Sequence, residues 1–398
     1  MTVKISRGKS VLALAAFAML VAGCGSASTS VSGSATSSDS ASASSSASAS
    51  SDMPSPTVGS ADFSLELPDI QKYCGTKPWK MGVIDGYGGN SWRVQVHKLL
   101  ESVAKQCPTN QGVEYMDANL DAQKYSSTLN SWTAQGVNVI VAYDDFGQAV
   151  VPAIRDAYKN GVQIATSNAF PGDAVAGKDL TAVVMHDADH LMEGIAEFYK
   201  KTLPGGKGGL VFLGGTPGNL NDPYLLASLK KVLERPEYAD IKLLQDTPAI
   251  TNWDFGKAQQ VTAGLINKYG DALGGFVTSY VAMTPSVFRA YEAAGKPMVP
   301  VAGVASSNET ICLIEKQGAD KVQVYSQDGT TLEAVLALRL ALAAFEGISI
   351  DEPQVVKLPT FIDTSSGVTP KCRTDLPPGA DLAMGEKELA LLPEFFKN

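Results

Sequence analysis

The sequence contains few of the residues on which enzyme and nucleic-acid sites usually depend. Its 398 residues include only three histidines, and no long basic run interrupts a net charge of -9. That charge balance argues against nucleic acid as a partner. The Gly-x-Ser-x-Gly motif of many hydrolases is also missing, and three histidines offer few general bases. We therefore expect that the chain is not an enzyme.

Motifs for cofactors and structural metals are missing as well. A dinucleotide loop needs Gly-x-Gly-x-x-Gly, and after Gly86 and Gly88 the third glycine position is occupied by Ser91. No phosphate-binding Gly-x-x-x-x-Gly-Lys-Ser/Thr motif occurs, and no Cys-x-x-Cys pair is available for zinc. We expect no cofactor and no metal.

One segment could still hold a metal. His186 and His190 enclose two aspartates, and two histidines four residues apart on a helix could share a zinc ion. The glutamate of His-Glu-x-x-His is absent, however, and the only other histidine is His97. We interpret the segment as a helix start that is capped by Asp187 or Asp189.

No hydrophobic run is long enough to span a membrane. Val11–Ala22 is apolar and follows a basic start, but a spanning helix needs about 20 such residues. The run ends in Leu20-Val21-Ala22-Gly23-Cys24, which resembles a bacterial lipobox. This resemblance implies a signal peptide over 1–23 and diacylglycerol on Cys24, which would anchor the chain to a membrane. An ordinary signal peptide with a chance cysteine is the alternative.

Residues 24–60 have too few apolar side chains to form a core. After Cys24 they are almost entirely Ser, Ala, Thr and Gly. Burial of such a segment would not offset the entropy lost on ordering it, so we expect a disordered tether. Its average reach would be about 30–35 Å.

Cysteine is scarce, with five residues in the chain, and one of them is assigned to lipid. The other four are Cys74, Cys107, Cys312 and Cys372. An even number of cysteines in an exported chain indicates two disulfides, which can pair in three ways. We favour Cys74–Cys107 with Cys312–Cys372, each worth about 4 kcal/mol in the chain-entropy model. Free buried thiols are the alternative.

From Pro78 onward, short apolar runs alternate with amphipathic stretches. The runs are rich in β-branched residues and bounded by glycine or polar turns, as in buried strands. They are Met81–Ile84, Val137–Tyr143, Val162–Ala165, Ala182–Met185, Leu210–Leu213, Phe276–Ser279, Val299–Ala302 and Val322–Tyr325. Helical spacing lies between them, and its longest stretch, Thr330–Phe345, ends at Gly347. This alternation predicts an α/β protein with parallel sheets, and the number of units predicts two lobes.

Ligands of open parallel sheets bind beyond the carboxyl ends of the strands. The segment after the first predicted strand carries Asn90, Trp92 and Arg93, which offer an amide, a flat apolar ring and a set of donors. Ordinary core packing is the alternative for Trp92.

Several of these segments together resemble the type 1 periplasmic binding proteins, especially the ribose and galactose group. The similar segments are Asn90-Ser91-Trp92, Leu213–Asn219, Asn252–Phe255, Ala290–Gly295 and Gln327. The resemblance implies two Rossmann-like lobes joined by three crossovers. It places 78–186 and 327–350 in one lobe, and 187–326 and 351–398 in the other. Each favoured disulfide then stays within one lobe, so the lobes remain free to open and close.

The resemblance also implies a role. We expect an extracytoplasmic, lipid-anchored monomer that binds a small polar ligand, most simply a monosaccharide, and delivers it to an ABC transporter permease. Rings would stack on the ligand, while amides, hydroxyls and charged groups would meet its polar edges. The expected ligand-binding residues are Asn90, Trp92, Arg93, Asp144, Asn168, Asn219, Trp253, Tyr280 and Gln327.

Other segments depart from the family pattern. Ser167-Asn168, Asn221–Pro223, Tyr280-Val281 and Val304–Ser306 stand where sugar binders often carry charged or amide groups. A ligand other than a sugar is therefore an alternative. A receptor that reports its ligand to a sensor kinase is another, because the sequence has no readable motif for the partner surface.

Overall fold

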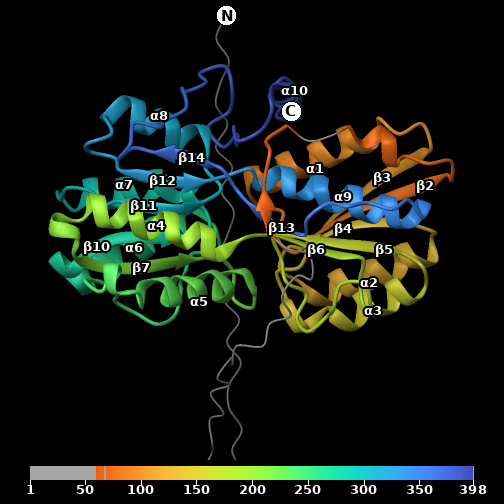
Figure 1. Ribbon diagram of the computed structural model, residues 1–398, viewed down its shortest axis with the longest axis horizontal. Helices are drawn as coiled ribbons and strands as arrows, with labels where there is room; N and C mark the ends of the chain where they lie inside the picture. The colour runs from red at the N-terminus through yellow and green to blue at the C-terminus, as the bar shows by residue number, and fades with distance from the viewer. Residues whose placement is uncertain (1–59, 67–68, 398) are drawn as a thin grey trace, which may run out of the picture. The chain divides into compact units, whose positions relative to one another are not determined.

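The computed structural model describes residues 60–66 and 69–397, which contain two β-sheets flanked by helices (Figure 1). The predicted signal peptide, Cys24 and nearly all of the predicted tether lie outside these residues. No helix within the described ranges is long and apolar enough to cross a membrane. The predicted α/β architecture with two lobes matches the two sheets.

The first sheet is parallel throughout its described strands, in the order β1-β13-β6-β5-β4-β2-β3. Helices α1 and α9 cover one face, and α2 and α3 cover the other (Figure 1). We call this sheet with its helices the first lobe. Its elements are β1 (Ala61–Asp62), β2 (Trp79–Asp85), α1 (Ser91–Ala104), β3 (Asn110–Asp117), α2 (Ala122–Ala134), β4 (Val139–Tyr143), α3 (Val151–Lys159), β5 (Gln163–Ser167), β6 (Ala182–His186), α9 (Thr330–Glu346) and β13 (Val355–Lys357).

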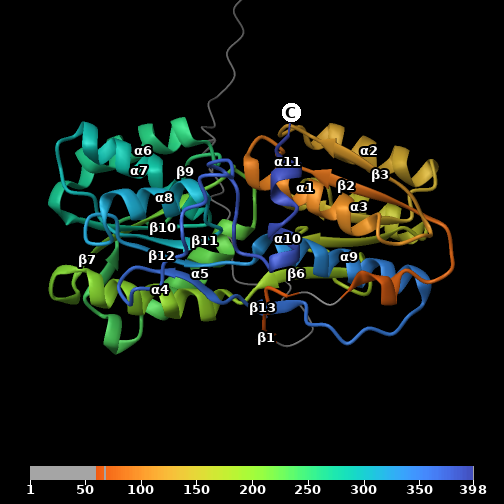
Figure 2. The same cartoon turned by 90° about the horizontal axis from the view of Figure 1, so that it is seen from above.

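The second sheet has the order β14-β12-β11-β10-β7-β8, and β9 also pairs with β7. Among its described pairs only β12–β14 is antiparallel. Helices α4 and α5 lie on one side and α6 and α7 on the other (Figure 2). The elements of this second lobe are α4 (Ala188–Thr202), β7 (Gly208–Gly214), α5 (Asn221–Leu233), β8 (Ile241–Leu243), β9 (Ala249–Ile250), α6 (Phe255–Tyr269), β10 (Leu273–Thr278), α7 (Thr284–Ala293), β11 (Val301–Val304), α8 (Asn308–Gln317), β12 (Val324–Gln327) and β14 (Thr360–Asp363).

The helices form where the spacing of apolar residues predicts them. In α1 the buried face includes Val96, Leu99 and Leu100, at one-turn spacing. Helix α9 is buried along most of its length and ends at Gly347, whose φ of 75° is the left-handed conformation that glycine adopts easily. This long apolar helix buries a large apolar area against the first sheet, and that burial stabilises the lobe.

The chain crosses between the lobes after β6, after β12 and after β13. Strand β13 pairs with β6 in the first sheet, while β14 pairs with β12 in the second. The third crossover therefore lies at 358–359, and the boundary expected at 350 was wrong. The sequence misled because 351–359 holds only a short apolar run beside a proline. The first lobe also begins earlier than residue 78, since β1 pairs with β13.

The favoured disulfides are both present. Cys74 bonds Cys107 beside α1 of the first lobe, and Cys312 of α8 bonds Cys372 after β14. Each bridge thus begins and ends on elements of a single lobe. No disulfide joins the two lobes within the described residues.

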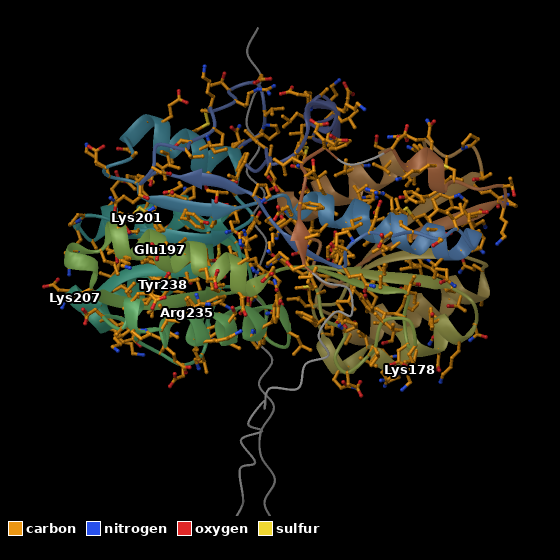
Figure 3. The ribbon with its side chains drawn as sticks, in the orientation of Figure 1. Lys178, Glu197, Lys201, Lys207, Arg235 and Tyr238 are labelled. Atoms are coloured by element: carbon orange, nitrogen blue, oxygen red, sulfur yellow. A yellow bond between two sulfur atoms is a disulfide. The ribbon has the colours of Figure 1, made fainter. Side chains whose placement is uncertain are left out.

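Charged side chains mark the outer surface of the second lobe. Figure 3 shows Glu197, Tyr238 and Arg235 on the same side of this lobe. The Tyr238 hydroxyl donates to Glu197 at 2.6 Å, and Arg235 pairs with Glu193 at 2.5 Å. Exposed ion pairs of this kind contribute little to stability because water screens the two charges.

Candidate functional site

A small cavity lies where the carboxyl ends of strands from both lobes meet. Its volume is about 50 Å³, about that of a few water molecules. The lining residues follow strands or begin helices, as expected for open parallel sheets. They are Asn90, Trp92, Arg93, Asn168 and Thr330 from the first lobe, and Asn221, Trp253, Ser279, Tyr280, Val304 and Ala305 from the second.

The first-lobe wall is built around the start of α1. The side chain of Asn90 accepts a hydrogen bond from the Arg93 amide at 3.0 Å and so caps this helix. One residue into the helix, the Trp92 indole donates to the Thr330 hydroxyl at 3.0 Å. Because Thr330 begins α9, the indole is held between two helices. This fixed ring presents an apolar surface to the cavity.

Arg93 forms a buried ion cluster beside that ring. Its guanidinium donates to Asp85 at 3.0 Å and to Asp145 at 3.0 and 3.3 Å. The guanidinium carbon also lies 4.7 Å from the centre of the Tyr143 ring and 5.8 Å from that of Trp253. The cluster therefore joins the ends of β2 and β4 and reaches a ring of the opposite lobe.

Burial dominates the protonation of the cluster. Desolvation raises the pKa of Asp85 to about 7, although the Arg93 charge opposes this shift. Burial likewise raises the pKa of Asp145. The adjacent aspartates hold Arg93 firmly protonated, with its pKa above the ordinary value. Two carboxyls thus share one cation, and no excess positive charge remains to attract an anionic ligand.

These shifts predict how stability depends on pH. A carboxyl with a raised folded-state pKa keeps its proton after the unfolded chain has lost it, so the free energy of unfolding falls as pH rises from about 4 through about 7. We expect a lower melting temperature at pH 8 than at pH 5, measured by calorimetry. Asp85→Asn should flatten this dependence. A melting temperature that rises with pH would contradict the prediction.

The second-lobe wall depends on a chain of hydrogen bonds. The Trp253 indole donates to the Ser279 hydroxyl at 3.1 Å, and Ser279 donates to Asp222 at 2.7 Å. Asp222 also accepts from the Gly215 amide at 2.7 Å. A Cβ on Gly215 would lie 2.0 Å from the Trp253 ring, so only glycine lets this ring lie against the backbone. Burial also raises the pKa of Asp222.

Strained backbone is concentrated at the cavity. Asn168, Trp253 and Ala305 line it and have φ values of 52°, 52° and 58°. Residues with side chains rarely adopt this left-handed conformation, and its cost is tolerated mostly at functional sites.

Asn221 offers the cavity an unused polar atom. Its side-chain oxygen is buried and has no hydrogen-bond partner among the described residues. Leaving a buried acceptor unpaired costs about 1–3 kcal/mol. A ligand hydroxyl that donated to this oxygen would recover that energy.

Six of the nine expected residues line the cavity: Asn90, Trp92, Arg93, Asn168, Trp253 and Tyr280. The side chains of the other three residues form hydrogen bonds within their own loops and turns. Asp144 accepts from the Phe146 amide in the turn after β4, and Asn219 donates to Asp222. Gln327 donates to the Tyr325 hydroxyl at the second crossover. These three support the walls and do not line the cavity.

The sequence reasoning missed Asn221, Ser279, Val304, Ala305 and Thr330 as lining residues. Four of them stand at or after the carboxyl ends of strands, where a ligand was expected, and three of these four (Asn221, Val304 and Ala305) lie in segments that depart from the family pattern. Thr330 could have been found in another way: it is the first residue of the longest predicted helix, and residues at the start of a helix often face a ligand.

The histidine segment forms a helix start. The Asp187 side chain accepts from the His190 amide at 3.0 Å and caps α4, as one of the two predicted caps. His186 is buried and faces Glu333 of α9, with 3.4 Å between Nδ1 and Oε1. Within the described ranges, no three His, Cys, Asp or Glu side chains are grouped to hold a metal ion.

Comparison with known proteins gives one family match. Residues 81–347 match the model of the periplasmic binding protein domain. A xylitol-binding protein of Mycolicibacterium smegmatis is 27% identical over 241 residues, which are 60% of this chain and 66% of that protein. The match thus spans just under two thirds of this relative.

Solved structures share the fold. A solute-binding protein of an ABC transporter from Mycobacterium smegmatis, with bound glycerol, has a TM-score of 0.61 and 18% identity, covering 76% of this chain and all of that one. A counterpart from Actinobacillus succinogenes with bound D-allose has a TM-score of 0.59 and 22% identity, covering 73% and 99%. The predicted two-lobed fold is confirmed.

Proposed function

We propose a function from one premise: the chain belongs to the periplasmic binding protein domain family. Members of this family bind solutes, and the prediction that the chain is not an enzyme is confirmed by this membership. The ligand we propose is a neutral polyhydroxy compound, a monosaccharide or a polyol. It would bind between the lobes at this cavity, which would have to widen from its volume of about 50 Å³ to hold it.

The charge balance of the cavity is the observation that carries this proposal. Arg93 is the cation among the lining residues, and Asp85 and Asp145 already share it. A ligand carboxylate would have to compete with both for the same guanidinium. Hydroxyl groups meet no such cost, since they can accept from remaining Arg93 donors and donate to Asn221.

The aromatic rings fit the same class of ligand. Trp92 and Trp253 face the cavity from opposite lobes and are both held by hydrogen bonds. Sugars and polyols present C–H groups that pack against such rings. The relatives named for xylitol, glycerol and D-allose support this chemistry.

The delivery route is part of the proposal. Lipid on Cys24 would hold the protein at the outer face of the cell membrane, and the body would reach an ABC transporter permease as a monomer. The relatives that work with ABC transporters support this route. Closure of the lobes over the ligand would be the state that the permease recognises, because the ligand contacts both lobes only then.

A thermal-shift screen of the full chain tests the ligand class. Xylitol, glycerol, D-allose and ribose form one set, and malate and glutamate form the other. A ligand present at 100 times its dissociation constant should add about 2.7 kcal/mol to the free energy of unfolding. We expect at least one neutral compound to raise the melting temperature and both acids to leave it unchanged. A response to acids alone would overturn the proposal.

A further inference from the structure

The C-terminal segment runs from one lobe to the other. We define the strap as Cys372–Ala383, which leads into α10 (Glu386–Leu389) and α11 (Leu392–Phe395). The strap begins on the second lobe, where Cys372 bonds Cys312 of α8. Helix α11 packs against α1 of the first lobe (Figure 2). This segment was expected to belong to the second lobe throughout, and that expectation was wrong.

The second-lobe end of the strap is held at the start of α8. The side chain of Asn308 donates to the Arg373 carbonyl at 2.7 Å and accepts from the Arg373 amide at 2.9 Å. Its backbone amide donates to the Ala380 carbonyl at 2.7 Å, as does that of Glu309 to Pro378. First-turn amides have no partner within their own helix, so the strap satisfies them. This end of the strap is therefore fixed.

The first-lobe end meets α1 through a paired amide. The Gln95 side chain donates to the Asp381 carbonyl and accepts from the Asp381 amide, both at 2.9 Å. Both residues are fully buried. A Cβ on Gly379 would lie 2.2 Å from the Ser91 hydroxyl, so the strap passes against the first turn of α1. Leu392 of α11 is also fully buried. The strap thus contacts the first lobe through the two Gln95–Asp381 hydrogen bonds, and α11 adds an apolar contact through Leu392.

The strap also borders the cleft. Pro378 and Gly379 line a second cavity of about 270 Å³, together with Tyr87 and Phe255. Asn90 and Trp253 line both this cavity and the ligand cavity, so the two are neighbours. None of the crossover residues lines the second cavity. The strap thus joins the lobes at a place apart from the three crossovers.

We propose that the strap is a latch on the ligand cleft: it links the lobes as a fourth connection, and its first-lobe end must release Gln95 and α1 before ligand enters or leaves. This inference rests on the proposed ligand cavity, because a latch matters only if the lobes part. The three crossovers can rotate as a hinge, whereas the buried Gln95–Asp381 pair cannot stay formed when the lobes separate. Release of the strap would then limit the rate of ligand exchange.

Distances between spin labels test the latch without any ligand. Asn130→Cys on α2 and Asn267→Cys on α6 are exposed label sites, one on each lobe. In the full chain we expect one narrow distance distribution. Combining Gln95→Ala with Leu392→Ala should add a population at longer distance. The exposed control Lys387→Ala on α10 should leave the distribution unchanged.

A second variant keeps the test decisive if the double variant Gln95→Ala with Leu392→Ala does not fold. Gly379→Ala removes no hydrogen bond, yet its methyl group would displace the strap from Ser91, so it should add the same longer population to a smaller extent. Identical distributions in Gly379→Ala, the double variant if folded, and Lys387→Ala would overturn the latch.

Ligand exchange gives an independent readout. Xylitol is the probe, and its dissociation is followed by tryptophan fluorescence, since Trp92 and Trp253 line the cavity. The latch variants should release xylitol at least about fivefold faster than the Lys387→Ala control, and equal rates would overturn the latch. If xylitol and the other neutral compounds do not bind at all, the proposed function fails, while the label distances still decide whether the strap holds the lobes.

Discussion

Replacement of Arg93 by alanine should lower the free energy of unfolding by about 3–5 kcal/mol at pH 7, the usual cost of breaking a buried ion pair. Arg93 is 7% exposed, and its removal would leave Asp85 and Asp145 buried side by side without a cation. Urea denaturation measures the loss. Ligand binding should be lost as well, because the guanidinium lines the cavity.

Arg235→Ala is the matched control for this prediction. Arg235 also pairs with a carboxylate, that of Glu193, but on the exposed face of the second lobe (Figure 3). Its removal should change stability little. Adding Asp145→Asn to Arg93→Ala should recover part of the loss, since it removes one of the two buried carboxyls left without a partner. Equal effects of Arg93→Ala and Arg235→Ala would show that Asp85 and Asp145 do not need the Arg93 charge to remain buried.

Replacement of Trp253 by alanine should raise the dissociation constant of the neutral ligand by at least about 30-fold, or about 2 kcal/mol. The variant loses the second-lobe ring and leaves Ser279 without the indole as donor. Isothermal titration calorimetry measures the change. The effect should exceed that of ordinary surface contacts because the ring is nearly buried and directly lines the cavity.

Two further variants distinguish the contribution of the aromatic ring itself from that of its position in the cavity. Trp253→Phe keeps an aromatic face and should lose less affinity than alanine. Gly215→Ala keeps the indole but places a methyl group 2.0 Å from it, so the ring must move and binding should weaken. An affinity within threefold of the parent in Trp253→Ala, with folding intact, would remove this ring from the site.

The buried strands were the most predictable part of the fold. All eight predicted apolar runs overlap strands, because a strand covered on both faces needs apolar residues throughout. Strand β3 was not predicted. It lies at the edge of the first sheet and is half-exposed along its length, so Asn110–Asp117 carries no continuous apolar run. Strand β13 was missed because three residues give too little pattern.

The site was predictable in location and only partly in detail. Strand ends indicated where to look, and the aromatic residues Trp92 and Trp253 both line the cavity. Asp144 and Asn219 follow strands too, but their side chains satisfy backbone and neighbouring polar groups. Sequence spacing does not reveal this choice, because side chains of Asp and Asn serve turns and ligands equally well. The Arg93 cluster could not be predicted from the sequence, because its partner Asp145 lies far along the chain and only the tertiary fold brings it to α1.

The position of β13 orders the assembly of the chain during synthesis. The second lobe draws its α4–β12 elements from one continuous stretch, so most of it can fold as soon as that stretch is complete. The first lobe starts earlier along the chain, yet β1 has no partner until β13 has been made. The half that begins first therefore stays incomplete until most of the second lobe has been made, and a nascent chain that ends before β13 leaves the edge of the first sheet open to chaperones or to aggregation.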